Sequence, residues 1–201
     1  MKQAITITII VVIALISVVC LLYPIVYKIV FNRNFKNIYY KKIKRLVLGH
    51  DWRLLNNFTF ALDSENDATF DHIIFSDKYI YCLVDKYWHG GLNGKKEDDS
   101  WFFYPDNKSK CYIDNPLKIN DIRKEKLSLI TGLDSSIFIS IVVINDDCEI
   151  DELKLDDSNN YIVKISKLKK LITLIEKRDV SPFNDEELQK VVYEMKKLRI
   201  E

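Results

Sequence analysis

The chain has 201 residues, of which 48% are hydrophobic and 29% are charged. This composition excludes a wholly disordered or collagen-like protein, and the length fits one folded domain. The formal net charge is +1, but from residue 51 onward there are 22 basic and 29 acidic residues. An acidic domain argues against indiscriminate binding of nucleic acid, which requires phosphate neutralisation, yet it leaves room for a narrow basic groove.

The first segment, Gln3 to Tyr27, is uncharged and consists mostly of Ile, Val, Leu and Ala. A helix of this length, rising ~1.5 Å per residue, would cross a ~30 Å hydrocarbon core. We therefore predict a transmembrane signal anchor over residues 1–31. A buried core helix is disfavoured because such helices rarely lack a polar face at this length. A cleaved signal peptide is the closer alternative, although no small-x-small cleavage signal follows.

Basic residues behind this segment predict its orientation. Residues 28–50 contain seven Lys or Arg and no acidic residue, whereas Lys2 is the only charged side chain before them. By the positive-inside rule, a single-pass plasma-membrane protein with an outside N-terminus and a cytoplasmic C-terminal domain is expected. Residues 32–50 are predicted to form a basic juxtamembrane helix. Its apolar positions fall on one helical stripe: Phe35, Ile38, Tyr39, Ile43, Leu46 and Val47.

Several β-rich runs follow, and they predict a sheet. They are Leu54–Leu62, Ala68–Phe75, Tyr79–Asp85 and Trp101–Tyr104, with a hairpin turn across residues 76–78. The run Ile137–Ile144 is apolar without alternation, as expected of a central strand that is covered on both faces.

Three helices are predicted in the same region and after it. Asn115 and Pro116 are typical of a helix start, and Gly132 is a typical stop after Thr131. Helices are also expected over 162–177 and over 185–200, the latter with Asn184 as N-cap. Helices and strands in this order predict an α/β fold with a domain core at 51–150 and a C-terminal helical extension at 151–201.

The cysteines and histidines point to no metal centre. Cys20, Cys82, Cys111 and Cys148 have no CxxC spacing, and we expect them to be reduced. The three histidines lack zinc-site spacing.

Several separated pieces between about 34 and 150 resemble one family, the nuclease-related domain (NERD), a member of the PD-(D/E)xK nuclease superfamily. The pieces fall in the family's order: DWRLLNNFTF at 51–60, ATFDHIIF at 68–75, YIYCLVDK at 79–86, glycines 90, 91 and 94 followed by Trp101, NPLKIN at 115–120 and SIFISIVVI at 136–144. The resemblance implies a restriction-endonuclease-like mixed sheet flanked by helices.

The resemblance also implies a chemistry. Active members of the superfamily carry an Asp on one strand and a Glu two residues before a Lys on the next strand. Residues i and i+2 of a strand project from the same face, so these side chains share one site. The two carboxylates hold magnesium, which polarises the scissile phosphate, and the Lys orients or helps deprotonate the attacking water.

This chain departs from that pattern. Asp71 and Lys86 match the family's catalytic Asp and Lys, but Val84 stands in place of the Glu, and Ile119 in place of the helix Gln. Asp71 alone would be a weak metal ligand, because one carboxylate is a poor magnesium site. Trp101 and Asn115 are the binding residues that the resemblance suggests.

A neighbouring acid could replace the missing Glu. Asp85 is adjacent in sequence but points to the opposite face of a regular strand, and only a bulge would bring it round. Glu97, Asp98 and Asp99 lie in the loop after the glycines.

Structural roles are open for the same residues. Asp71 is either a relic ligand or a strand-end residue satisfied by backbone donors, and His72 is expected to be structural. Trp88, His89 and Trp101 could form a base-stacking surface, although aromatic residues near glycine turns more often pack in the core.

Taken together, the sequence predicts a membrane-anchored cytoplasmic nuclease-related protein, catalytically weak or inactive, that binds DNA or a protein partner. One alternative is an active magnesium-dependent DNA nuclease with a relocated second carboxylate. Another is a membrane-associated structural scaffold. Asp71, Val84 and Lys86 should meet at one end of a mixed sheet, with Asp85 on the opposite face.

Overall fold

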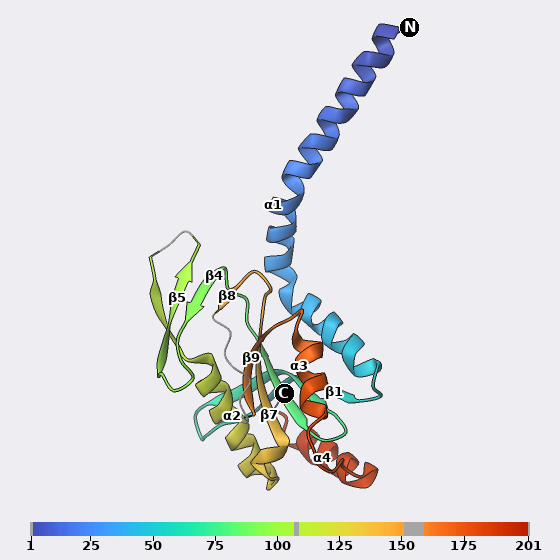
Figure 1. Ribbon diagram of the computed structural model, residues 1–201. Helices are drawn as coiled ribbons and strands as arrows, with labels where there is room; N and C mark the ends of the chain where they lie inside the picture. The colour runs from blue at the N-terminus through green and yellow to red at the C-terminus, as the bar shows by residue number, and fades with distance from the viewer. Residues whose placement is uncertain (1, 107–108, 151–158, 201) are drawn as a thin grey trace. The chain divides into compact units, whose positions relative to one another are not determined.

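The computed structural model describes residues 2–106, 109–150 and 159–200 (Figure 1). The chain divides into two compact units, Met1–Ile38 and Tyr39–Glu201. The start of the predicted C-terminal extension, residues 151–158, lies outside the described residues.

Helix α1, Lys2–Leu48, begins in the first unit and contains the apolar segment. Ile9–Tyr27 is long and apolar enough to cross a membrane, by length and composition, and none of this stretch is buried. Leu21 and Tyr23, for example, are 72% and 66% exposed. Such exposure does not fit a core helix of a soluble protein, so Ile9–Tyr27 is a candidate membrane span; a signal sequence passes the same test of length and composition.

The last turns of α1 belong to the second unit and bury one side. Four apolar residues of the predicted stripe lie in the core there: Tyr39, Ile43, Leu46 and Val47. The lysines between these buried residues, Lys41, Lys42 and Lys44, remain exposed. The predicted amphipathic character is therefore present in this part of the helix.

The larger sheet has the strand order β1-β2-β3-β7-β9. Its strands are β1 Arg53–Ala61, β2 Asp67–Phe75, β3 Ile80–Asp85, β7 Phe138–Ile144 and β9 Asn160–Lys164. The first three pair antiparallel, and β3, β7 and β9 pair parallel, so the sheet is mixed as predicted. All residues of β7 are buried, and it lies between β3 and β9.

Strand β9 corrects the prediction of a helix from residue 162. The segment Asn160–Lys164 pairs in parallel with β7, and helix α3 starts only at Leu168 and ends at Glu176. β-branched Ile162 and Val163 suit a strand that has a neighbour to pair with. The C-terminal extension therefore adds a strand to the central sheet and is not purely helical.

A smaller sheet has the order β6-β5-β4-β8. Its strands are β4 Gly90–Asn93, β5 Ser100–Pro105, β6 Cys111–Asp114 and β8 Glu149–Ile150. Only β5 was predicted. The other three have two to four residues, which is too short for a readable hydrophobic period.

Helix α2, Pro116–Thr131, has the predicted ends. The Asn115 side chain accepts hydrogen bonds from the N–H groups of Leu117 and Lys118, and Gly132 adopts φ 68°, which favours glycine. Helix α4, Asp185–Lys197, buries Val192 and Met195 in the same core cluster as Leu127 of α2 and the β3 residues Cys82 and Val84. The four cysteines are free thiols.

Candidate functional site

Asp71 lies where β2 separates from β3. His72 and Leu83 form the last pair of that antiparallel ladder, so Asp71 and Val84 are the next residues beyond it. Asp71 is 9% exposed, and its carboxylate accepts a hydrogen bond from the backbone N–H of Asp85 with an Oδ2–N distance of 2.8 Å. Asp71 therefore extends the strand pairing with its side chain.

A pocket of about 270 Å³ opens beside this strand end. It is lined by Val84, Lys86, Trp88, Ile113, Asp114, Pro116, Ile119, Asn120, Arg123 and Val142. Val84 and Lys86 thus face the same space, as the strand period predicts. Val84 is only 6% exposed and packs in the apolar core, whereas Lys86 is exposed.

Asp85 points to the other face of β3. Its Oδ2 lies 3.1 Å from Nε2 of His72, and Nδ1 of His72 lies 2.7 Å from Oδ1 of Asn56. The ring of Tyr40 stacks on His72 with 6.2 Å between centroids. Asp85 is therefore held in a buried polar group on the face opposite Val84. Strand β3 pairs with β7 in unbroken register from Ile80 to Asp85, so it contains no bulge that would bring Asp85 into the pocket.

Arg123 is one of two charged residues at this site that were not predicted from the sequence; the other is Asp114. It lies on α2, lines the pocket, and its Nη1 donates to the carbonyl oxygen of Thr69 at 3.4 Å. Burial lowers the pKa of the Arg123 guanidinium, and the charge of Asp71 opposes that shift. The spacing from Asn120 to Arg123, one helical turn, was the available signal, because such residues share a helix face.

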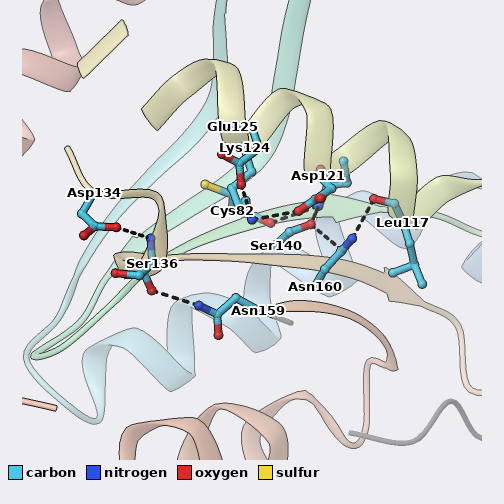
Figure 2. Close-up of polar contacts among 11 residues, drawn as sticks. Cys82, Leu117, Asp121, Lys124, Glu125, Asp134, Ser136, Ser140, Asn159 and Asn160 are labelled. Atoms are coloured by element: carbon cyan, nitrogen blue, oxygen red, sulfur yellow. Dashed lines mark hydrogen bonds and ion pairs between the residues drawn. The ribbon is translucent and has the colours of Figure 1, made fainter. Parts of the chain in front are cut away.

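A buried network of hydrogen bonds fixes α2 on the sheet. Asn120 Nδ2 donates to Ser140 Oγ at 2.7 Å, Ser140 Oγ donates to Asn160 Oδ1 at 2.9 Å, and Asn160 Nδ2 donates to the carbonyl of Leu117 at 3.0 Å. Figure 2 shows Ser140 and Asn160 on the sheet beneath α2. The network joins α2, β7 and β9, so it sets the position of Arg123 above the sheet.

Trp101 packs in the small sheet, and Asn115 caps the start of α2. Trp101 is fully buried, and its Nε1 donates to the carbonyl of Lys95 at 2.7 Å. Asn115, besides capping α2, donates through Nδ2 to the carbonyls of Lys96 and Asp98. Neither residue lines the pocket. These contacts give both residues a structural reason to be present.

The acidic loop after the glycines stays away from the pocket. Asp98 accepts from the N–H of Lys95, and Asp99 forms an ion pair with Lys118 that lowers the pKa of the Asp99 carboxyl. Among the described residues, the carboxylate that does line the pocket is Asp114, at the end of β6. Asp114 was not among the predicted site residues, because strand β6 was not predicted.

The side chains at this site do not fit magnesium. Magnesium binds several hard oxygen ligands, usually carboxylates, in near-octahedral geometry. Here Val84 offers no oxygen, Oδ2 of Asp71 already accepts an N–H, and Arg123 adds a second positive charge beside Lys86, so Asp114 is the one carboxylate that lines the pocket among the described residues. In the described part of the chain, no group of three His, Cys, Asp or Glu side chains could hold a metal ion.

The comparison with protein families agrees with the sequence resemblance. The family model described as "Nuclease-related domain" matches residues 33–145, more than half of the chain. No curated protein and no solved structure matches the chain. The matched range includes β1 to β6, α2 and β7, and therefore all the residues that line the pocket.

Proposed function

Because the chain belongs to the nuclease-related domain family, we propose that it is a membrane-anchored, cytoplasmic member that binds DNA without cleaving it. In this proposal the pocket beside β3 receives a backbone phosphate. The observation that carries it is that Arg123 joins Lys86 in this pocket, while Val84 stands in place of the Glu that an active member needs.

The charges favour a phosphate over a metal ion. Lys86 and Arg123 line the pocket together with one acid, Asp114. Arg123 is well suited to phosphate oxygens because its planar guanidinium can donate two parallel hydrogen bonds. The negative charge of Asp71 opposes the lowering of the Arg123 pKa by burial and so favours the charged guanidinium.

The walls of the pocket would limit how DNA is held. Trp88, Ile113 and Pro116 provide apolar surface next to the cations. The remainder of the domain is acidic, so contacts outside the pocket would be few. We therefore expect moderate affinity with a shallow salt dependence, corresponding to about two neutralised phosphates.

The test measures DNA binding by the full chain in detergent micelles. Fluorescence anisotropy of labelled single-stranded and duplex DNA probes reports the binding. The double substitution Lys86→Gln/Arg123→Gln should weaken binding by roughly tenfold or more, since each contact to a charged group is worth ~1.5–3 kcal/mol. A matched control is Lys177→Gln/Arg199→Gln, which removes one Lys and one Arg from exposed positions outside the pocket.

Unchanged binding in the pocket variant, or equal losses in both variants, would contradict the proposal. Absence of DNA binding by the native chain would favour the protein-interaction scaffold.

One observation favours the alternative of an active nuclease. Asp114 lines the pocket with Lys86 and could act as the relocated carboxylate. In that case magnesium-dependent cleavage should depend on both Asp71 and Asp114.

A further inference from the structure

A second pocket, of about 310 Å³, lies between the last turns of α1 and the start of α3. We call it the α1–α3 pocket; it is lined by Lys42, Arg45, Leu46, Ile165, Ser166, Leu168 and Lys169. All of these residues belong to the second unit of the chain. The family match ends at residue 145, so this pocket is built partly from chain that the family model does not include.

The floor of the α1–α3 pocket is apolar and its rim is cationic. Leu46, Ile165 and Leu168 are 8%, 4% and 3% exposed and form the floor. The rim residues Lys42, Arg45 and Lys169 are exposed, so they can approach a ligand without prior unpacking. Within the described chain, no acidic side chain lines this pocket.

The start of α3 adds positive potential to the rim. The amide groups at a helix N-terminus carry partial positive charge, so acidic residues stabilise the first turn and basic ones destabilise it. Helix α3 has no acidic residue there and no capping side chain at Lys167. Lys169 and Lys170 follow instead. An anion bound in the pocket would offset this unfavourable arrangement.

One acid lies nearby, and it is already engaged. Asp146 Oδ1 accepts a hydrogen bond from the N–H of Ser166 at 3.0 Å, which braces the turn before α3. Its Oδ2 is 3.9 Å from Nζ of Lys42. That distance is longer than a hydrogen bond, so Lys42 remains able to turn towards a bound anion.

We propose that the α1–α3 pocket binds the phosphate head group of an anionic phospholipid, with a phosphate monoester as the preferred form. Three cations match the charge of a monoester, about −1.5 to −2 at pH 7. The apolar floor suits the glycerol and acyl carbons next to the phosphate, which a free phosphate ion lacks.

The position along the chain also favours a lipid. Lys42 follows Tyr27, the end of the segment that could span a membrane, by 15 residues. These 15 residues belong to helix α1, which rises ~1.5 Å per residue, so the connecting segment is roughly 22 Å long. The lipid source rests on the membrane anchoring proposed above, whereas the phosphate site itself does not.

Titration of the full chain in nonionic micelles tests the proposal without requiring a bilayer. The ligands are short-chain phosphatidic acid, phosphatidylglycerol and phosphatidylcholine, with inorganic phosphate as the free-ion arm. Saturable binding of phosphatidic acid, tighter than that of phosphatidylglycerol, is expected. Phosphatidylcholine and inorganic phosphate should bind at least tenfold more weakly.

Two variants that each remove two positive charges distinguish binding in the pocket from nonspecific attraction to basic residues. Lys42→Gln/Lys169→Gln should weaken phosphatidic acid binding roughly 10- to 30-fold, at ~1 kcal/mol per basic residue. The matched control is Lys41→Gln/Lys170→Gln, which alters the adjacent exposed lysines on the same two helices and outside the pocket. It should change the affinity less than twofold.

Equal losses in the two variants would overturn the pocket assignment. Equal affinity for inorganic phosphate would overturn the lipid assignment and identify a soluble phosphate as the ligand. Loss of DNA binding, with lipid binding intact, in Lys42→Gln/Lys169→Gln would place a nucleic acid there instead. Failure of DNA binding through Lys86 and Arg123 would leave this result unaffected, because the two pockets share no residue.

Discussion

The carboxylate of Asp71 accepts a hydrogen bond from the backbone N–H of Asp85, with 2.8 Å between Oδ2 and N. Asp71, which the sequence resemblance aligns with a metal-binding Asp, therefore ties the end of β2 to the end of β3. Asp85 in turn contacts His72 on the opposite face of the sheet. Asp71 thus has a structural role, and the backbone-donor alternative for this residue is the one that the geometry matches.

Replacing Asp71 should reduce stability. In Asp71→Ala the buried N–H of Asp85 loses its acceptor, which costs about 1–3 kcal/mol. Asp71→Asn retains an acceptor oxygen and should lose less. Unfolding of the full chain in denaturant, monitored by tryptophan fluorescence, measures both. An Asp71→Ala variant as stable as the native protein would contradict this role.

Much of the larger sheet could be predicted because its strands are long and apolar. The β2–β3 hairpin and α2 were recognisable from local signals: a polar turn at 76–78, Asn115 before Pro116, and Gly132 after Thr131. Strand β9 was not recognisable, because its pairing with β7 depends on a partner in another part of the chain. Tertiary context decided its conformation.

Two residues of the candidate site, Val84 and Lys86, could also be predicted from local sequence. The period of two in a strand places Val84 and Lys86 on one side of β3, and this is local information. Arg123 and Asp114 reach the same pocket only because α2 and β6 pack against the end of β3. The spacing from Asn120 to Arg123 puts these two residues on one face of α2, but no spacing indicates that this face and the end of β6 lie beside the end of β3.

Close contact between Gly94 and Trp101 provides a second stability prediction. A Cβ at Gly94 would lie 2.2 Å from Cδ1 of the fully buried Trp101. Gly94→Ala should therefore overpack the small sheet and cost about 1–3 kcal/mol. Gly91→Ala is the matched control, because its nearest neighbour would be the Cβ of Glu149 at 3.8 Å.

Thermal unfolding of the two variants decides this prediction. A Gly94→Ala variant no less stable than Gly91→Ala would mean that Trp101 can move out of its site. Such mobility would keep open the alternative in which Trp101 contributes to a base-stacking surface.

The proposed topology predicts protection from outside proteases. Seven basic residues follow the apolar segment and should remain in the cytoplasm, which places the domain inside the cell. Protease added to intact cells should leave a C-terminal epitope tag attached to the full domain, and digestion should occur only after lysis. Digestion of the tag in intact cells would show that the domain lies outside the cell and would contradict the proposed orientation.

Catalytic silence is the prediction that most directly tests the proposed function. The full chain should show no magnesium- or manganese-dependent cleavage of single-stranded or duplex DNA above that of a Lys86→Ala control. The physical reason is the donor set: Val84 supplies no oxygen, and Arg123 adds a second positive charge to the Lys86 that active members also carry.

Restoring the missing carboxylate should not be sufficient for activity. In Val84→Glu the new side chain would pair with Lys86 or Arg123, which line the same pocket, and introducing a charge at a position only 6% exposed should also destabilise the fold. Asp114→Asn should leave the absence of cleavage unchanged. Metal-dependent cleavage by the native chain that disappears in both Asp71→Asn and Asp114→Asn, while both variants remain folded, would instead establish an active nuclease with Asp114 as its second carboxylate.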